Sequence, residues 1–248
     1  MCPLTIIKTE GSEDMYSFNS KVRFSETDQN GRLKLSSLMD YFQDCSTFHS
    51  ESAGVGIDHE MENKRAWVVS YWQIEIDRYP FLYENIKTGT FATSFKGACG
   101  NRNFFMEDEK GNMIARAKSI WAYVDTENGR PVRITEEEVE KYGTDNLFEL
   151  ENMGRKVQKG KDPVLMESFK VRKEYIDRNG HVNNCRYVEM ASEYIPEESD
   201  IKKVRVGYMK PARYGDTIYP YVSEDENKLT VELADENRNS YCITEFIK

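Results

Sequence analysis

The sequence has no apolar stretch long enough to cross a bilayer, and its cysteines show no pattern typical of a disulfide framework or a zinc site. The five cysteines are odd in number, widely spaced and free of Cys-x-x-Cys pairs; they are Cys2, Cys45, Cys99, Cys185 and Cys242. The apolar run at residues 1–7 is too short for a signal peptide. We therefore expect reduced thiols, no metal site, no membrane span and a cytoplasmic location.

An excess of positive charge is also missing. Asp and Glu number 43 against 34 Lys and Arg, which gives a formal net charge of -9. Such a balance argues against general binding to nucleic acids or to anionic membranes. With 39% hydrophobic residues over 248 positions, the chain has enough apolar content for one large or two small globular domains.

Reactive side chains are most concentrated in residues 177–184. Asp177, Asn179 and His181 alternate along an extended or turn-like segment, and Gly180 lets the backbone bend just before a helix-like stretch. A carboxylate can attack a carbonyl or activate water, an imidazole can polarise it or move a proton, and an amide can orient either group. Free N–H groups at a helix start would favour a carbonyl oxygen that gains negative charge. This combination suits acyl transfer.

A structural interpretation of the same residues stays open. Asp, Asn and Gly favour turns for their own reasons, so Asp177 and Asn179 could form Asx turns and cap the helix, with His181 at the surface. The chain has three histidines in all. We expect His49 on one face of a helix, and His59, in a polar stretch, to be exposed rather than a ligand.

Apolar periodicity predicts two helices and several strands. The first helix begins near Leu35 and ends near Gly54, and the second covers residues 183–194. A strand is expected around residues 21–25, and an antiparallel sheet over residues 67–134. The polar stretch 136–162 indicates an inter-domain connection. The remaining strands are expected at residues 203–209, 217–223, 229–234 and 241–247.

The opening pattern returns in the second half of the chain. Lys21-Val22-Arg23, followed by an Asp-x-Asn-Gly turn at Asp28, matches Lys170-Val171-Arg172, followed by the same turn at Asp177, at constant spacing. The repeat predicts an α+β fold of two copies, each an antiparallel sheet wrapped around one long helix. We assign an N-terminal domain to residues 1–140, a linker to 141–165 and a C-terminal domain to 166–248.

The two copies differ where chemistry is expected. Only the second copy has His181, whereas the first has Arg32 at that position. Because the Asp-x-Asn-Gly residues that both copies share are expected to form the turn, the residue that differs, His181, is the better candidate for a reactive group. We therefore place the reactive site in the second copy and give the first a binding or scaffolding role.

A resemblance to a known family rests on motifs that occur in order along nearly the whole chain. In the first half these motifs are residues 24–33, 40–44, 67, 77–80, 102–104, 117–119 and 121. In the second half they are residues 177–184 and Tyr187. With these motifs, the sequence resembles the bacterial and plant acyl-acyl carrier protein (acyl-ACP) thioesterases, which have a tandem, or double, hotdog fold.

The resemblance implies hydrolysis of the thioester between a fatty acyl chain and the phosphopantetheine arm of acyl carrier protein, with release of free fatty acid. The family's catalytic positions fall on Asp177, Asn179 and His181. Asp177 would be nucleophile or general base, His181 polariser and proton donor, and Asn179 the group that orients them. The first half would house much of the acyl chain. No metal or redox cofactor is implied, and a monomer or a homodimer is expected.

The sequence departs from the plant pattern at one place. Plant members have a Glu-Cys pair shortly after the second helix, where this chain has Pro211 and Ala212. A mechanism that requires that cysteine cannot operate here. Cys185 is no obvious substitute, because it falls inside the predicted helix and a lone cysteine usually serves packing.

Because carrier protein is acidic, an acidic enzyme needs a local basic surface to bind it. Basic residues gather around the predicted site, with acidic residues among them; they are Arg172, Lys173, Arg178, Arg186, Lys202, Lys203, Arg205, Lys210 and Arg213. Three other functions fit much of the sequence: an acyl-coenzyme A thioesterase of the same fold, an acyl-binding protein without turnover, and a hotdog hydratase. Typical hydratases have Asn-Pro-x-His, whereas here Gly180 directly joins Asn179 to His181.

Overall fold

The computed structural model describes residues 15–197 and 199–248. The predictions for residues 1–7 and for Cys2 therefore lie outside the described residues. The chain divides into two compact units. Unit 1 runs to Val68 and resumes with Asp77–Glu151, while unit 2 comprises Val69–Ile76 and Asn152–Lys248. Strand β2 (Arg65–Ile76) thus begins in unit 1 and ends in unit 2.

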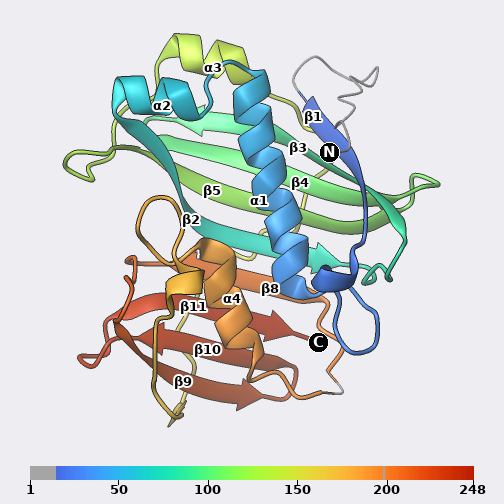
Figure 1. Cartoon of the computed structure of the whole chain (residues 1–248), viewed down its shortest axis with the longest axis vertical. Coiled ribbons are helices and arrows are strands. Elements are labelled where there is room, and N and C mark those ends of the chain that lie inside the picture. Colours follow the sequence, from blue (N-terminus) through green and yellow to red (C-terminus); the bar gives the residue numbers. More distant parts are fainter. Residues whose placement is uncertain (1–14, 198) are drawn as a thin grey trace. The chain divides into compact units, whose positions relative to one another are not determined.

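Unit 1 is an antiparallel sheet with one long helix packed on it (Figure 1). The strands lie in the order β1-β3-β4-β5, and helix α1 contacts β1 and β3. Besides the start of β2, the elements of unit 1 are β1 (Met15–Lys21), the 3-10 helix η1 (Phe24–Glu26), α1 (Leu35–Ser52), α2 (Ile57–Asn63), β3 (Asn85–Lys96), β4 (Cys99–Asp108), β5 (Met113–Asp125) and α3 (Glu136–Tyr142).

The apolar stripe that predicts the first helix is the face that α1 buries. Leu38, Met39 and Phe42 are fully buried, and the ring centroids of Phe42 and Phe104 on β4 lie 5.4 Å apart. Helix α1 ends at Ser52, two residues before Gly54, whose φ of +71° suits the left-handed backbone that follows a helix. The predicted first helix is confirmed.

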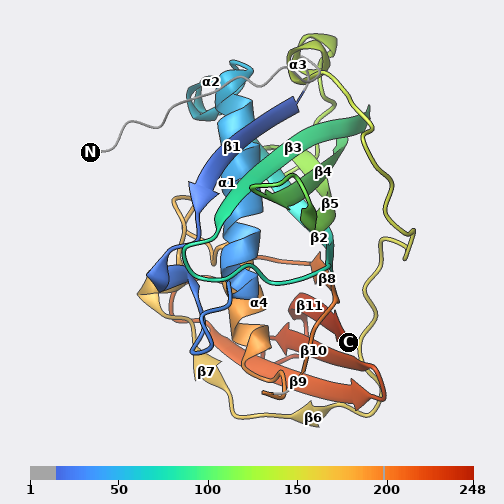
Figure 2. The same cartoon turned by 90° about the vertical axis from the view of Figure 1, so that its right-hand side faces the viewer.

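Unit 2 repeats the arrangement with a shorter helix. Its strands lie in the order β2-β8-β11-β10-β9-β6, and α4 contacts β10 and β11. Strand β7 pairs with β9, and Figure 2 shows β6 and β7 running beside that strand. Besides the end of β2, the elements are β6 (Val164–Leu165), β7 (Phe169–Lys170), the 3-10 helix η2 (Lys173–Tyr175), α4 (Asn184–Ser192), β8 (Lys203–Tyr208), β9 (Thr217–Asp225), β10 (Lys228–Ala234) and β11 (Ser240–Ile247).

A segment without regular structure, residues 152–162, packs on the face of the unit 2 sheet that lies opposite α4; we call it the connecting segment. Tyr208 donates a hydrogen bond to the Asn184 carbonyl on α4 at 3.0 Å, so Arg205, three residues earlier on β8, points to the other face. There, Arg205 donates to the carbonyls of Met153 at 2.9 Å and of Gly154 at 3.1 Å.

Further along, the connecting segment stays close to the same sheet. Val157 is buried, and Ser223 on β9 donates to the carbonyl of Lys161 at 2.5 Å. A side chain at Gly160 would overlap the Cβ of Ser223, so the backbone can approach the strand only because this residue is glycine.

The structure corrects two sequence-based expectations about elements. The strand expected around residues 21–25 is wrong, because β1 ends at Lys21 and η1 follows, closed by an Arg23 N–H bond to the Glu26 carboxylate at 2.8 Å. The stretch 136–162, expected to be only a connection, begins with α3, where Thr135 accepts the Glu138 N–H at 3.2 Å as N-cap. No helix within residues 15–197 and 199–248 is long and apolar enough to span a membrane.

Candidate active site

The residues singled out at 177–181 form one tight turn in unit 2. Asp177 Oδ1 accepts the N–H of Asn179 at 2.8 Å and that of His181 at 3.4 Å. The Asp177 N–H donates to the His181 carbonyl at 2.8 Å, and the Gly180 N–H donates to the Asp177 carbonyl at 3.1 Å. Gly180 has a φ of +76°, which favours glycine at this corner. The structure therefore brings Asp177, Asn179 and His181 together, with Asp177 as the centre of the turn.

The turn leaves part of each reactive group available. Asp177 and His181 are half-buried and Asn179 is exposed. One carboxylate oxygen of Asp177 holds the backbone, so the other oxygen can accept a proton or attack. The Asx turn of the structural interpretation is thus present, and it does not consume the whole carboxylate.

The start of α4 offers fewer free N–H groups than the sequence suggests. Asn183 is the N-cap, and its side chain accepts the Cys185 N–H at 2.9 Å. The Arg186 N–H donates to the Asn183 carbonyl at 2.9 Å. Neither Asp177 nor Asn179 is therefore the N-cap. Among the described residues, the N–H of Asn184, the first residue of α4, has no acceptor.

Unit 1 contains the same turn without the histidine. Asp28 Oδ1 accepts the N–H of Asn30 at 2.8 Å and of Arg32 at 3.0 Å, and the Asp28 N–H donates to the Arg32 carbonyl at 2.8 Å. The Arg32 guanidinium lies over the Phe81 ring, 5.9 Å from its centroid. The carboxylate and the glycine are therefore required by the turn in both units, and the imidazole is what distinguishes unit 2.

Each turn is braced by a second loop of its own unit. In unit 1 the Leu33 N–H donates to the Pro80 carbonyl at 2.8 Å, and in unit 2 the Val182 N–H donates to the Ala212 carbonyl at 2.9 Å. Pro211 is exposed and Ala212 is fully buried, so the position of the plant-type cysteine carries only a methyl group. Cys185 is buried on α4, in keeping with a packing role.

Most of the basic residues expected around the site have acidic partners. Arg205 is buried and paired with Glu245 at 2.6 Å, so its assignment to a surface patch is wrong. The other pairs are Lys210 with Asp235, Arg186 with Glu189 at 2.5 Å, Lys202 with Asp200 at 2.9 Å and Arg172 with Glu174 at 3.4 Å.

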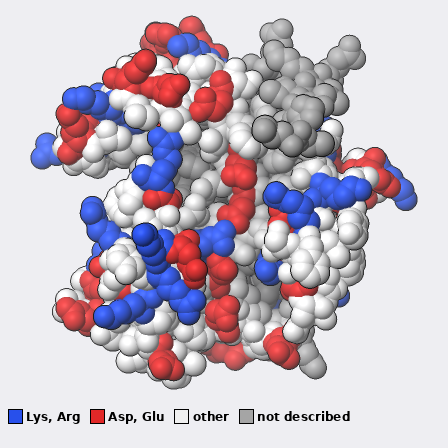
Figure 3. Space-filling view, viewed as in Figure 1, with Lys and Arg blue, Asp and Glu red and all other residues white. Residues whose placement is uncertain are grey.

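Three exposed cations in or beside the turn have side chains that form no ion pair among the described residues, although the Arg213 backbone N–H donates to the Asp216 carboxylate at 2.8 Å. They are Lys173 on η2, Arg178 in the turn itself and Arg213 in the bracing loop. Figure 3 shows Lys and Arg side chains gathered over the part of unit 2 that contains η2 and the start of α4, with acidic side chains among them. We call Lys173, Arg178 and Arg213 the basic trio.

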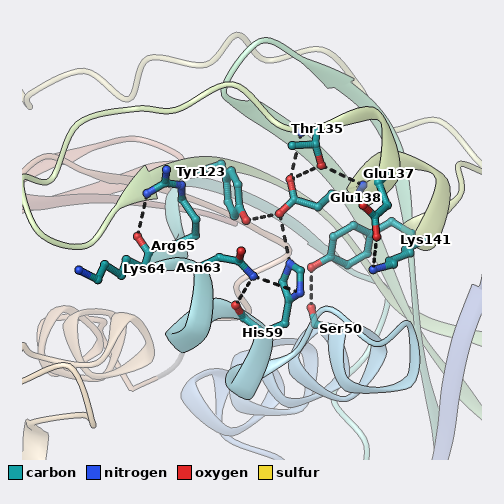
Figure 4. A network of polar contacts seen from close by, with 11 residues as sticks. Ser50, His59, Asn63, Lys64, Arg65, Tyr123, Thr135, Glu137, Glu138 and Lys141 are labelled. Atoms are coloured by element: carbon teal, nitrogen blue, oxygen red, sulfur yellow. Dashed lines mark hydrogen bonds and ion pairs between the residues drawn. The ribbon is translucent and has the colours of Figure 1, made fainter.

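A second cluster of titratable side chains lies in unit 1 (Figure 4). The Tyr123 hydroxyl donates to the Glu138 carboxylate, and His59 Nε2 lies 3.4 Å from Glu138 Oε1. The Thr135 N–H and hydroxyl donate to Glu138 Oε2 at 3.0 and 2.9 Å. Burial alone would raise the pKa of Glu138, but the hydrogen bonds from Tyr123 and Thr135 hold it below its usual value. With its oxygens occupied in this way, Glu138 ties α3 to β5 and α2.

Sequence reasoning missed this cluster, although Thr-x-x-Glu at residues 135–138 is a visible capping-box signal. His59 is also partly buried rather than exposed, because it contacts Glu138. His49 lies on the inner face of α1, as expected, and its Nδ1 is 2.7 Å from Arg102 Nη1. Burial, together with the Arg102 charge, lowers the pKa of His49 to about 3, so the imidazole is neutral near pH 7.

Both halves of the chain match models of one protein family. Residues 13–142 match the acyl-ACP thioesterase N-terminal domain, and residues 158–247 match the acyl-ACP thioesterase C-terminal domain. The chain belongs to the acyl-ACP thioesterase family. The predicted family is thereby confirmed, and the order of its two domains follows the repeat seen in the sequence.

Individual acyl-ACP thioesterases are distant relatives of this chain. It is 26% identical to oleoyl-acyl carrier protein thioesterase 2, chloroplastic, of Arabidopsis thaliana, over 91% of this chain and 68% of that protein. It is also 26% identical to palmitoyl-acyl carrier protein thioesterase, chloroplastic, of Gossypium hirsutum, over 73% of this chain and 47% of that protein. The match thus spans about two thirds of one relative's length and about half of the other's.

Solved structures of the family share the fold over nearly the whole chain. An acyl-ACP thioesterase from Bacteroides thetaiotaomicron matches with a TM-score of 0.86 and 26% identity, over 94% of this chain and 97% of that one. The 12:0-ACP thioesterase from Umbellularia californica matches in fold with a TM-score of 0.85 and 18% identity, over 96% of this chain and 98% of that one. These likenesses confirm the predicted α+β double hotdog fold.

Proposed function

We propose that this protein hydrolyses the thioester of fatty acyl-ACP and releases free fatty acid. The observation that carries the proposal is the duplicated turn, which has the same backbone bonds in both units but presents an imidazole only in unit 2. Membership of the acyl-ACP thioesterase family supports the reaction class. A cytoplasmic location stays a prediction of the sequence, as does a monomeric or homodimeric state.

The proposed chemistry divides between two side chains. The free oxygen of Asp177 either attacks the thioester carbonyl carbon, giving an acyl-aspartate anhydride that water then hydrolyses to free fatty acid, or removes a proton from the water that attacks the carbonyl directly. His181 polarises the carbonyl and supplies the proton that the departing phosphopantetheine sulfur takes up as the C–S bond breaks. Asn179 orients the two groups, and the N–H of Asn184 at the start of α4 donates to the oxyanion. Unit 1 would hold much of the acyl chain.

The test measures release of free thiol from matched acyl-ACP and acyl-coenzyme A panels. Asp177→Asn and His181→Ala should each lower kcat by at least about 100-fold, because each removes a group that acts in the transition state. Asp28→Asn is the matched control, since it makes the same change in the same turn of unit 1 and should leave turnover near the native value. Asparagine still accepts backbone N–H bonds, so both Asp→Asn variants retain the turn.

The outcomes separate the candidate functions. Turnover that survives both Asp177→Asn and His181→Ala would remove this turn from the mechanism. A preference for coenzyme A thioesters would identify an acyl-coenzyme A thioesterase, and binding without turnover would identify an acyl-binding protein. A hydratase would instead consume the double bond of an enoyl thioester and release no thiol.

We further propose that the basic trio receives the acidic carrier protein. Its members lie on η2, in the turn and in the bracing loop, and their side chains form no ion pair among the described residues, so their charge is available to a partner. Changing Lys173, Arg178 and Arg213 to Glu should lower kcat/KM for acyl-ACP by about 10- to 100-fold. The same variant should hydrolyse a small acyl-N-acetylcysteamine thioester at the native rate. An equal loss on both substrates would contradict a docking role.

A further inference from the structure

A buried tyrosine connects α4 to the loop that braces the candidate active site. The Tyr187 hydroxyl accepts the N–H of Ala212 at 2.7 Å, and the Ala212 carbonyl accepts the N–H of Val182 at 2.9 Å. Val182 directly follows His181, and both Tyr187 and Ala212 are buried. The ring of Tyr187 packs edge-on against Tyr208, with centroids 6.0 Å apart. Two consecutive hydrogen bonds therefore run from α4 to the backbone beside the imidazole.

Unit 1 lacks the first of these two bonds, because neither its donor nor its acceptor is present there. Counting from the turn, Leu38 of α1 stands where Tyr187 stands on α4, and leucine has no hydroxyl. Pro80 stands where Ala212 stands, as its carbonyl accepts the Leu33 N–H at 2.8 Å, and proline has no N–H. The acceptor and the donor are therefore both present in unit 2 and both absent from unit 1.

This paired difference separates what the turn needs from what unit 2 adds. The turn of unit 1 keeps all of its own bonds and its carbonyl brace with Leu38 and Pro80 in place. The bond between Tyr187 and Ala212 is therefore not a requirement of the turn. It fixes the bracing loop to α4 only in the unit where the turn presents His181.

We propose that Tyr187 is a positioning residue for His181: by holding the Ala212 N–H, it fixes the loop whose carbonyl holds the backbone after the imidazole. This inference rests on the proposed function, since it assumes that His181 takes part in the hydrolysis and that the hydrogen bond between Tyr187 and Ala212 keeps it in position. A displacement of about 1 Å at a reacting group can cost about 100-fold in rate, so a single bond that fixes the turn can matter to kcat.

The experiment converts unit 2 to the bonding pattern of unit 1. The double variant Tyr187→Phe/Ala212→Pro removes the hydroxyl and the N–H together, so neither is left buried without a partner, and it keeps the ring against Tyr208. Tyr71→Phe is the matched control, because it removes another buried tyrosine hydroxyl of unit 2, one that donates to Gln73 at 3.2 Å and lies outside the turn. For each variant, kcat, KM, the pH dependence of kcat and the melting temperature are measured with acyl-ACP.

We expect the double variant to fold, to keep its KM and to lose about 10- to 100-fold in kcat, with a changed pH dependence of kcat. Tyr71→Phe should change the melting temperature at most. A folded double variant with native kcat and pH dependence would overturn the proposal. An unfolded double variant would also overturn it, because the bond would then serve the fold rather than His181.

His181→Ala, measured alongside, separates this inference from the proposed function. If His181→Ala keeps full turnover, the site assignment fails, whatever the double variant does. If His181→Ala is inactive while the double variant is fully active, only the positioning role of Tyr187 fails.

Discussion

Replacing Arg205 by methionine should destabilise unit 2 by about 3 kcal/mol and loosen the connecting segment. The Arg205 guanidinium is buried against Glu245 at 2.6 Å and also donates to the Tyr71 hydroxyl at 3.2 Å. It further donates to three carbonyls of the connecting segment, those of Met153, Gly154 and Lys156, at 2.9, 3.1 and 3.3 Å. One side chain thus joins β8, β11, β2 and the connecting segment.

The magnitude follows from what the substitution leaves behind. Removing one partner of a buried ion pair typically costs about 3–5 kcal/mol, because the remaining charge is left in a poorly solvated place. Glu245 would keep Lys228, whose Nζ lies 3.4 Å from its other oxygen, so the lower end of that range applies. The three carbonyls can turn to water once the connecting segment moves away, so they add little to the total.

Two assays report on the two parts of this prediction. Denaturant unfolding gives the loss of stability, and limited proteolysis should cut the variant faster within residues 153–156. Arg172→Met is the control, because Arg172 and Glu174 form an exposed pair that should contribute less than about 1 kcal/mol. Arg205→Lys should fall between the two, since lysine keeps the charge and loses the planar fork. A loss below about 1 kcal/mol in Arg205→Met, or unchanged proteolysis, would refute the reasoning.

Three further predictions concern stability. Burial and the Arg102 charge lower the pKa of His49 to about 3, so below about pH 6.5 the unfolded chain binds a proton at this histidine and the folded chain does not. The free energy of unfolding should therefore fall by up to about 1.4 kcal/mol per pH unit from pH 6.5 toward 4. His49→Gln should show a shallower fall in denaturant titrations. Gly160→Ala should cost about 1–3 kcal/mol by forcing its Cβ against Ser223, and adding Ser223→Gly should recover part of the melting temperature. Thr135→Ala removes the N-cap of α3 and should cost about 1 kcal/mol, whereas Thr135→Ser, which keeps the hydroxyl, should cost less in the same thermal assay.

Local patterns in the sequence predict much of this fold. The apolar spacing from Leu35 to Cys45 gives the first helix, and turn residues separate the strands. The Asp-x-Asn-Gly frame gives both turns, because a short acidic side chain and a glycine close such a turn without help from distant residues. The sequence also places Asp177, Asn179 and His181 in a single turn, although their catalytic roles stay predictions.

The contacts that could not be predicted from the sequence join residues that lie far apart along the chain. Arg205 looks like one more surface cation, and only the pairing of β8 with β11 places Glu245 opposite it. The hydrogen bond from Ala212 to Tyr187 likewise joins residues on different elements, so neither residue type signals it alone. The capping box at Thr135 can be predicted from the sequence, but the run of acidic residues that follows it is also typical of a polar connection.

The sharing of β2 limits how this protein can be cut into pieces. Residues 71–75 of β2 pair with residues 203–207 of β8, so unit 2 takes an edge strand from the middle of the first half of the chain. A gene fragment that encodes only Asn152–Lys248 would leave β8 with a row of unpaired N–H and C=O groups, which invites pairing with other chains. The fragment should aggregate unless Val69–Ile76 is supplied as a peptide or fused to it. The repeat in the sequence therefore does not mark two pieces that fold independently, and experiments should use the full-length chain.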